Sequence, residues 1–354
     1  MNKRISLVTC GLLLSTSMAF AADSIDEAFK TGTASGDITL YGITHDAKGG
    51  NSDAEAGFAT IGLAYETASY MGLSVKAGFR AGHDMADGVL TDDALMTEAY
   101  VKYANNMFSL TAGRQAVDLE WMGDYHESVM AEIVAIPDTT VVLGYSNQIA
   151  FADEDEIDDF VQIGTDGAYV LDVKYSGVEG LELNPYFYSV PDTAEYYGLK
   201  ASYSSDMFGV VAQYAASSED IGSDGSIGHI EGNATLVGVS AALGYIQTDD
   251  TAGVGSIANL GDNITPFDNG GDNYAVDAKT AYGSLGYSVA GVDLGVLYGE
   301  TDFAGNSESS ELNLTAGYSL TDSLSLGLLY VDYDLEGSSS SDYKEYSATL
   351  AYSF

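Results

Sequence analysis

The chain has 354 residues, with 53 acidic residues against 12 basic ones and a formal net charge of -41. A surface this acidic repels phosphate backbones, so nucleic-acid binding is excluded as a function class. The hydrophobic content of 46% is too high for an intrinsically disordered chain. With one cysteine and four histidines, the chain lacks the material for a thiolate metal site or a disulfide framework. Its 41 glycines and 26 tyrosines favour a β-rich protein.

The N-terminus has the features of an export signal. Lys3 and Arg4 precede an apolar run over residues 5–20, and the run ends at Ala19-Phe20-Ala21. This order is typical of a secretory signal peptide with cleavage after Ala21. The run is shorter than the roughly 20 apolar residues that a spanning helix needs. We therefore expect an exported protein, and its one cysteine, Cys10, is lost with the signal peptide.

The rest of the chain alternates between apolar and polar residues with a period of two. Clear examples are residues 73–80, 292–299 and 311–319. This period predicts strands, each near the 9–11 residues that a tilted strand needs to cross a bilayer. We predict about eighteen strands, with sixteen as the alternative. They fall near residues 36–46, 56–67, 71–82, 95–104, 107–117, 129–137, 139–149, 168–176, 181–190, 195–204, 207–217, 229–237, 239–248, 276–288, 292–302, 308–319, 324–335 and 342–354.

The connections between these strands alternate in length. Tight turns are expected at 68–70, 105–106, 137–138, 177–180, 205–206, 238, 290–291 and 321–323. The other connections are longer and polar, at 46–56, 82–94, 118–128, 150–167, 218–228, 249–275, 303–307 and 336–341, apart from the short link at 191–194. Short periplasmic turns opposite long outer loops are the pattern of outer-membrane barrels.

The predicted fold is therefore all-β: a transmembrane antiparallel β-barrel in the outer membrane of a Gram-negative bacterium. A closed barrel satisfies every backbone hydrogen bond in lipid and leaves no open edge. Aromatic side chains are expected at the membrane interfaces. Ten tyrosines fall near strand ends on the outward phase: Tyr65, Tyr103, Tyr145, Tyr175, Tyr203, Tyr214, Tyr245, Tyr287, Tyr318 and Tyr352. The expected organisation is a signal peptide at 1–21, a periplasmic segment at 22–35 and the barrel at 36–354.

Four short motifs resemble a known family. They are residues 24–30 with 36–38, residues 98–103, residues 110–115, and the terminal Phe354. Together they resemble the Opr-type porins, including the major outer-membrane porins of epsilon-class proteobacteria. The resemblance implies an eighteen-stranded, trimeric porin with a constricting third loop folded inward, and it implies that Phe354 is the aromatic signal for outer-membrane assembly. The sequence departs from the family in its acidity: it has few basic residues for the lumen, which argues against a strongly anion-selective channel.

The phase of each strand assigns side chains to the lumen of the barrel. Basic residues expected there are Lys76, Arg80, Lys102, Lys174 and Lys200, and acidic ones are Glu98 and Asp172. On the lipid face a lysine at the midplane would cost roughly 2–4 kcal/mol. Arg114 lies on the outward phase of its strand, and we expect a bend at Gly113 to return it to the pore-lining basic cluster.

The third long loop, 118–128, carries several carboxylates. Asp118, Glu120, Asp124 and Glu127 would face the basic wall if the loop folds into the lumen, and the resulting transverse field would orient dipolar solutes. The alternative is a loop that lies over the rim. Its His126, like His45, His83 and His229, has no partner pattern of a hydrolase, so the sequence does not indicate an enzyme.

Two other loops are rich in acidic side chains. Asp153 and Asp155 in one, and Asp262, Asp268 and Asp272 in the other, are weak candidates for Ca²⁺, although neither loop has EF-hand spacing. Solvated acidic loops are the alternative, with divalent ions bridging to lipopolysaccharide or to neighbouring loops. No other cofactor is expected.

These observations predict a porin for passive diffusion of small hydrophilic solutes and ions, with a weak preference for cations. Expected partners are outer-membrane lipid, lipopolysaccharide and two further copies of the chain in a homotrimer. Two alternatives remain: a substrate-specific channel in which the third loop forms a binding site, and a structural or adhesive surface barrel with a blocked lumen.

Overall fold

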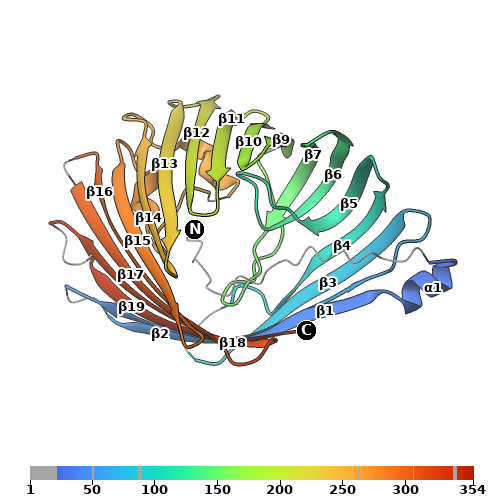
Figure 1. Ribbon diagram of the computed structural model, residues 1–354, viewed down its shortest axis with the longest axis horizontal. Helices are drawn as coiled ribbons and strands as arrows, with labels where there is room; N and C mark the ends of the chain where they lie inside the picture. The colour runs from blue at the N-terminus through green and yellow to red at the C-terminus, as the bar shows by residue number, and fades with distance from the viewer. Residues whose placement is uncertain (1–21, 50–51, 87–89, 262, 306, 338–340) are drawn as a thin grey trace.

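A single antiparallel sheet closes on itself into a barrel (Figure 1). The computed structural model describes residues 22–49, 52–86, 90–261, 263–305, 307–337 and 341–354. The predicted signal peptide, 1–21, lies outside the described residues. Closure is direct, because the first strand pairs with the second on one side and with the last on the other.

The elements follow one another in chain order with few helices. The strands are β1 (Thr33–Ala47), β2 (Ala54–Glu66), β3 (Leu73–Asp84), β4 (Ala94–Ala104), β5 (Phe108–Ala116), β6 (Tyr125–Ile136), β7 (Thr139–Ala150), β8 (Val161–Gln162), β9 (Ala168–Val178), β10 (Leu181–Val190), β11 (Ala194–Ser204), β12 (Phe208–Glu219), β13 (Gly225–Leu236), β14 (Val239–Thr248), β15 (Lys279–Val289), β16 (Val292–Phe303), β17 (Ser307–Ser319), β18 (Leu324–Leu335) and β19 (Tyr343–Ser353). The described helices are α1 (Ile25–Lys30) and two 3-10 turns, η1 (Gly255–Asn259) and η2 (Gly271–Tyr274).

The ring contains eighteen of the described strands. The two-residue β8 pairs only with β7, and β7 also pairs with β9, so β8 lies beside the ring and not within it. The prediction of about eighteen strands is confirmed, and the alternative of sixteen is wrong. The first strand begins at Thr33, three residues before the predicted position 36.

The two rims differ as the sequence predicts. Connections on the rim where β1 begins and β19 ends are short, and two of them are two-residue turns in which both residues have positive φ. In the β13–β14 turn Val237 and Gly238 have φ of 53° and 80°, and in the β15–β16 turn Ala290 and Gly291 have φ of 51° and 83°. Such turns match the right-handed twist of the paired strands. The opposite rim carries the long connections, including residues 249–278.

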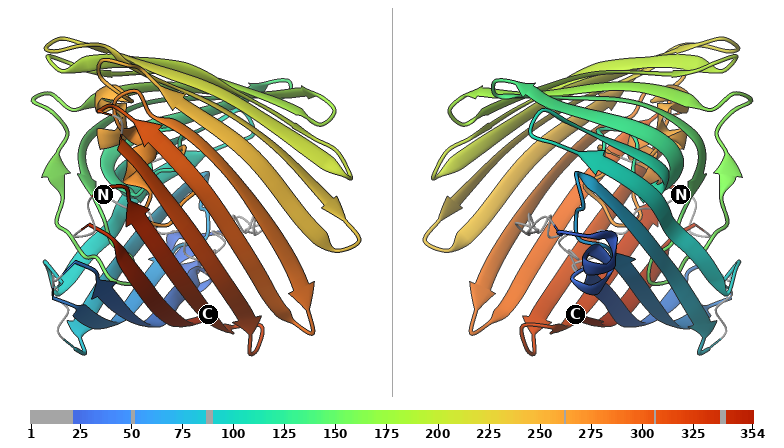
Figure 2. Two further views of the ribbon diagram at one scale, coloured as in Figure 1. Left: turned by 90° about the vertical axis from the view of Figure 1, so that its left-hand side faces the viewer. Right: turned by 90° about the vertical axis from the view of Figure 1, so that its right-hand side faces the viewer.

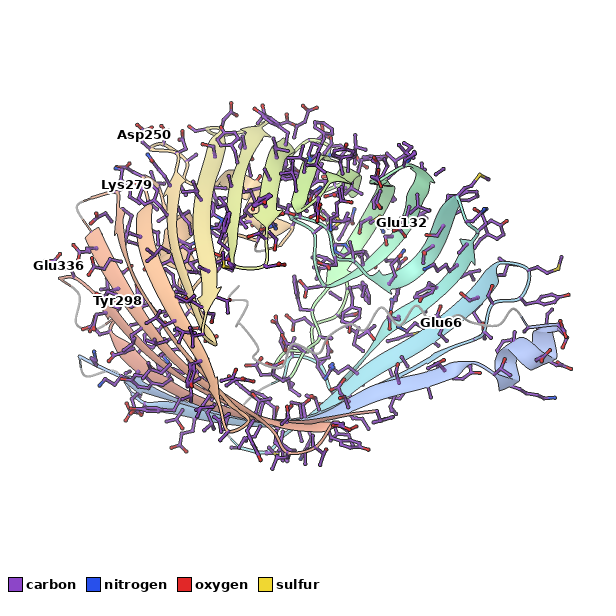
Figure 3. All side chains as sticks on the ribbon, in the orientation of Figure 1. Glu66, Glu132, Asp250, Lys279, Tyr298 and Glu336 are labelled. Carbon is purple, nitrogen blue, oxygen red and sulfur yellow. The ribbon has the colours of Figure 1, made fainter. Side chains whose placement is uncertain are left out.

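Side chains project from both faces of the ring (Figure 3). None of the described helices is long and apolar enough to cross a membrane. On the outward phase, large apolar side chains are exposed along every strand of the ring except β2, where Ile61 and Leu63 are half-buried, as a lipid-facing band requires. Eight of the ten tyrosines expected on this face are 37–53% exposed. Tyr103 is the least exposed of the eight and Tyr214 is the most exposed.

The interior of the barrel holds a packed apolar cluster. Twenty-two buried residues from β6, β7, β9–β15 and three connections form this cluster. A ring of this size is wide enough to enclose an aqueous channel. The cluster therefore fills one side of the lumen, and Figure 2 shows loop segments between the tilted walls. The loops that enter the lumen define the channel.

Candidate pore constriction

The connection between β5 and β6, residues 117–124, folds into the barrel. Trp121 is 1% exposed and Met122 is fully buried. The indole N–H of Trp121 donates to the Tyr186 hydroxyl on β10 at 3.0 Å, and its backbone N–H lies 3.5 Å from the Tyr188 hydroxyl. This hydrogen bond from the amphipathic tryptophan to β10 fixes the loop against the inner wall.

The infolded segment is shorter than the predicted loop 118–128. Strand β6 begins at Tyr125, so His126 and Glu127 belong to a strand and not to the loop. His126 is fully buried, with its ring nitrogens 2.8 Å from the Ser146 hydroxyl and 2.7 Å from the Gly123 carbonyl. It has a structural role at the start of this strand.

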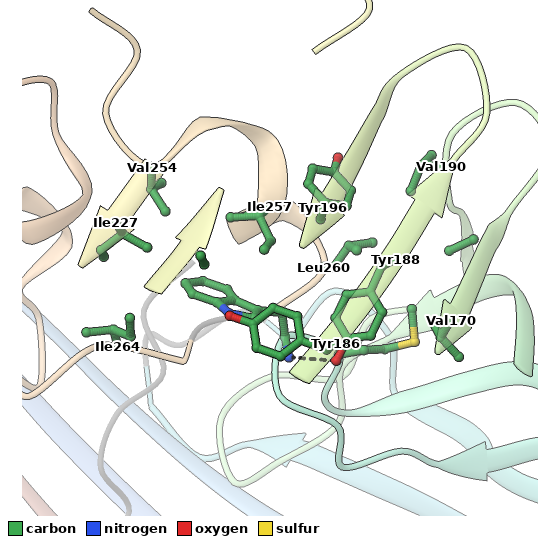
Figure 4. Packing of buried hydrophobic residues seen from close by; sticks show 14 of the residues in the cluster. Val170, Tyr186, Tyr188, Val190, Tyr196, Ile227, Val254, Ile257, Leu260 and Ile264 are labelled. Carbon is green, nitrogen blue, oxygen red and sulfur yellow. Dashed lines mark hydrogen bonds between the residues drawn. The ribbon is translucent and has the colours of Figure 1, made fainter. Parts of the chain in front are cut away.

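The connection between β14 and β15, residues 249–278, is a second infolded loop that the sequence reading missed. Five of its apolar side chains are at most 5% exposed and belong to one buried cluster with Ile227 and Ile246 on the inner wall; Figure 4 shows four of them near Ile227. These side chains are Val254, Ile257, Leu260, Ile264 and Phe267. The sequence signal for this infolding was the presence of five large apolar residues in one long polar loop, because such residues are rarely left together in water.

The connection between β7 and β9, residues 151–167, is a third infolded loop. It forms a small hairpin in which Ala152 pairs with Ile157. Ile157 is fully buried and packs with Tyr41, Phe58 and Leu90. The Asp153 carboxylate accepts the backbone N–H groups of residues 155 and 156 at 3.1 and 2.8 Å. Its apolar anchors therefore hold this acidic run against the inner wall, while Asp153 stays exposed.

Basic side chains on β3 are paired with carboxylates inside the barrel. The Lys76 ammonium lies 2.8 Å from the Glu98 carboxylate on β4. The Arg80 guanidinium binds Asp37 on β1 with both terminal nitrogens, at 2.8 and 3.1 Å, and also reaches the Thr60 hydroxyl at 3.1 Å. Bidentate pairing of this kind fixes orientation as well as charge.

Glu120 connects the third loop to two other elements. Its carboxylate lies 2.9 Å from the Lys200 ammonium on β11 and accepts the Asn263 side-chain amide at 2.7 Å. The Glu120 side chain is 6% exposed, and that of Lys200 is 32% exposed. The loops 117–124 and 249–278 and the β11 wall therefore meet at one carboxylate.

Asp172 lies behind this constriction and not on its open surface. It is 1% exposed and accepts the Asn184 amide and the Tyr188 hydroxyl, both at 2.7 Å. The third loop covers it, since the Glu120 backbone N–H lies 3.5 Å away. Asp172 thus lies on the inner face of β9, where it supports the loop and does not face the open lumen.

Arg114 follows the bend at Gly113. Gly113 has a φ of 126°, and the pairing of β5 with β4 ends at Ala99 and Arg114. The guanidinium lies 4.2 Å from the ring centre of Phe160 in the infolded third connection, and its Nε lies 3.4 Å from Glu127. β5 therefore separates from β4 after Arg114, but it stays paired with β6 as far as Ala116, where the loop 117–124 begins.

Replacing Gly113 with alanine should destabilise the barrel. The new Cβ would lie 2.2 Å from the Ala99 carbonyl oxygen, and a φ of 126° is open to glycine alone. Such strain costs of order 1–3 kcal/mol. The measurement is gel electrophoresis without heating, in which the folded barrel migrates differently from the heat-denatured chain. The urea concentration at which this heat-modifiable folded band is lost gives the stability. Gly232→Ala is the matched control, because its Cβ has no neighbour within 4 Å; equal shifts would contradict the account.

The remaining predicted residues are dispersed. Lys102 and Lys174 face inward on β4 and β9, and neither forms an ion pair with a described residue. Asp118 is exposed and Asp124 is half-buried. Phe354 is 52% exposed on the outward face, and its backbone exchanges two 3.0 Å hydrogen bonds with Gly36.

The candidate calcium ligands do not form a metal centre in the part of the chain that the structure describes. No group of three or more His, Cys, Asp or Glu side chains is arranged to hold an ion there. The Asp272 carboxylate accepts the Tyr333 hydroxyl at 2.5 Å, and Asp268 is 2% exposed. Asp153 and Asp155 are linked by the hairpin turn, and Asp262 lies outside the described residues.

The inward-facing basic side chains are confined to one arc of the lumen, where carboxylates accompany them. All inward-facing Lys and Arg side chains of the described ring lie on β3, β4, β9 and β11. The arc from β12 to β19 carries inward carboxylates, including Glu231, Glu311 and Glu345. Its lysines, Lys279 and Lys344, lie on the outward phase beside Asp277 and Asp332.

An eighteen-stranded barrel with a lipid-facing apolar band and a lumen narrowed by three infolded loops is an outer-membrane channel of a Gram-negative bacterium. The family model described as "Putative outer membrane protein" matches residues 28–208. That span is more than half of the chain, and the chain belongs to this family. No curated protein matched.

Solved structures with the same fold are similar over almost their whole length. OccAB1 of Acinetobacter baumannii has a TM-score of 0.81 at 14% identity, with 92% of this chain and 97% of that chain covered. OpdO of Pseudomonas aeruginosa has 0.80 at 15%, with 93% and 98% covered. A BenF-like porin of Pseudomonas fluorescens Pf-5 has 0.77 at 11%, with 92% and 99% covered. At these identities the likeness shows the fold.

Proposed function

We propose that the chain forms a water-filled channel for passive diffusion of small hydrophilic solutes and ions, with a weak preference for cations. The observation that carries the proposal is the balance of charge in the lumen. Lys76, Arg80 and Lys200 each have a carboxylate partner within 3 Å. The inward carboxylates of the β12–β19 arc have no lysine or arginine on the inner face of those described strands. The net lumen charge is therefore negative, and a negative lumen favours cations.

The separation of the two arcs also gives the channel a transverse field. Solutes with both a positive and a negative end would align across the constriction between the basic β3–β11 arc and the acidic β12–β19 arc. The reversal potential of the reconstituted protein in a potassium chloride gradient tests the proposal. We expect potassium to be the more permeable ion; strong chloride selectivity, or a folded protein without conductance, would contradict it.

Cation preference should fall as the pH drops through about 7. Burial raises the pKa of the Glu156 carboxyl to about 7, helped by its hydrogen bond to Asp158 and by the charge of Asp153, and desolvation by the surrounding protein raises the pKa of the neighbouring Asp153 to about 7 as well. Below that pH Glu156 becomes neutral, and the constriction loses a negative charge. Reversal potentials measured over a pH series should show the step. Glu156→Gln should reduce its size, and an unchanged step in this variant would rule out Glu156 as the titrating group.

A substrate-specific channel is the second candidate. It is favoured by the enclosed constriction that three loops build, and by the inward amino groups of Lys102 and Lys174, which form no ion pair with described residues. These groups are available to a negatively charged end of a solute. Saturable transport of one solute, with linear transport of others of equal size, would favour this candidate over simple diffusion.

We also propose assembly as a homotrimer, a cleaved signal peptide over residues 1–21 and recognition of Phe354 by the assembly machinery. The signal peptide is supported by Lys3 and Arg4 before the apolar run 5–20 and its Ala19-Phe20-Ala21 end. The trimer and the role of Phe354 are supported by the resemblance of residues 24–30, 98–103 and 110–115 to the Opr-type porins, including those of epsilon-class proteobacteria. Native mass spectrometry of the detergent-extracted protein would give both the number of copies and the mature N-terminus.

A further inference from the structure

The short helix α1 lies outside the barrel, next to the start of β1 (Figures 1 and 2). It is locally well defined by its own side chains. The Ser24 hydroxyl accepts the Glu27 backbone N–H at 3.2 Å, and the Glu27 carboxylate accepts the Asp23 backbone N–H at 2.9 Å. This reciprocal arrangement is a capping box, which starts a helix at a fixed position.

The helix is docked on the outer side of the wall. Ala28 is 4% exposed and packs against Ala68 in the β2–β3 turn. The backbone N–H of Ala68 donates to the Ala28 carbonyl at 3.0 Å, and the Tyr65 hydroxyl donates to the Phe29 carbonyl. Tyr65 shares the outward phase of β2 with Ile61 and Leu63. The helix is therefore held beside the lipid-facing band, on the rim where β1 begins and β19 ends.

The helix turns its large apolar side chains away from the protein. Ile25 is 62% exposed and Phe29 is 56% exposed, and a spacing of four residues places them on one face. Met71 in the adjacent turn is 76% exposed. These three side chains continue the apolar band of the barrel beyond the end of its strands. In water they would form an exposed apolar patch with nothing to cover it.

We propose that α1 is an interfacial anchor that rests in the periplasmic leaflet, with Ile25 and Phe29 at the boundary between lipid headgroups and acyl chains. An apolar face of this kind, with charged residues on the other side of the helix, lies in the plane of the interface. Asp26, Glu27 and Lys30 supply the polar side. Continuity with the lipid-facing band selects lipid as the occupant over a second copy of the chain.

Quenching by brominated lipid tests the anchor directly. Phe29→Trp in the full chain is reconstituted into phosphatidylcholine vesicles with bromine atoms on the acyl chains, either near the headgroup or near the chain end. The one natural tryptophan, Trp121, is 1% exposed inside the lumen and gives the same background in every variant. Asp26→Trp is the matched control on the polar side. We expect quenching by the shallow bromines to be at least about twofold stronger at position 29 than at position 26.

Two results would overturn the proposal. Red-shifted, unquenched emission from position 29 would place the helix in periplasmic water. Blue-shifted emission without quenching would place it against a neighbouring copy of the chain. Ile25→Trp gives the same readout from the same helix face, so a folding defect in one variant leaves the test intact. Folding is verified by the heat-modifiable band.

Discussion

The double substitution Ile257→Asp/Ile264→Asp should raise the single-channel conductance about twofold or more, because the narrowest cross-section limits conduction. Both side chains belong to the apolar cluster inside the barrel, where Ile257 is fully buried and Ile264 is 3% exposed. An unpaired carboxylate in such a cluster costs several kcal/mol, so the 249–278 loop should leave the wall. The strands of the ring stay paired, since the loop contributes no strand to it.

Planar bilayer recording of the folded variant measures the effect. Ile221→Asp is the matched control, because Ile221 is 90% exposed in another connection of the same rim and its replacement buries no charge. We expect the control to conduct like the unmodified protein. An unchanged conductance in the folded double variant would mean that the 249–278 loop does not limit the pore.

The barrel could be predicted from the sequence because two independent signals agree. Alternation with a period of two assigns one face of each strand to lipid, and the lengths of the connections assign each to a rim. The exact count was harder, because a closed ring depends on every strand and several have weak alternation. β1 shows the limit: residues 33–35 are small and polar, so pairing with β2, not hydrophobicity, extends the strand to Thr33.

The constriction was only partly predictable. Strand phase assigns Lys76, Arg80 and Lys200 to the lumen, because a charge facing lipid is costly. Strand phase shows to which face of the sheet a side chain points, but it does not show whether another segment of the chain covers that side chain. It could not show that Asp172 is covered, because the cover comes from the distant residues Glu120 and Trp121.

The loop 249–278 shows the same limit from the other side. Its many Asp, Asn and Gly residues give it the composition of a solvated outer loop, yet five apolar side chains decide where it lies. Burial of a few apolar side chains outweighs the average polarity of the loop. The polar residues are solvated whether the loop lies in the lumen or over the rim, so they contribute little to the free-energy difference between the two positions. The infolding of the acidic hairpin depends in the same way on Ile157 and Phe160.

Arg80→Gln should weaken the barrel and strengthen its preference for cations. The Arg80 and Asp37 side chains are 14% and 17% exposed, so loss of the guanidinium leaves a partly enclosed carboxylate without its partner. Hydrogen bonds to charged groups contribute about 1.5–3 kcal/mol, and the loss of stability should lie in that range. The lumen also loses a positive charge, so the reversal potential should move further toward the potassium limit.

The second substitution Asp37→Asn separates the two effects. In the double variant the net lumen charge returns to its original value, so the reversal potential should return close to that of the unmodified protein. Stability should recover in part, since no isolated charge remains. Lys102→Gln is the matched control, because it removes a positive charge that has no ion-pair partner among the described residues. It should shift selectivity with little change in the urea midpoint. If Arg80→Gln and Lys102→Gln alter the urea midpoint equally, the Arg80–Asp37 pair does not stabilise the wall, and its role is confined to the field inside the channel.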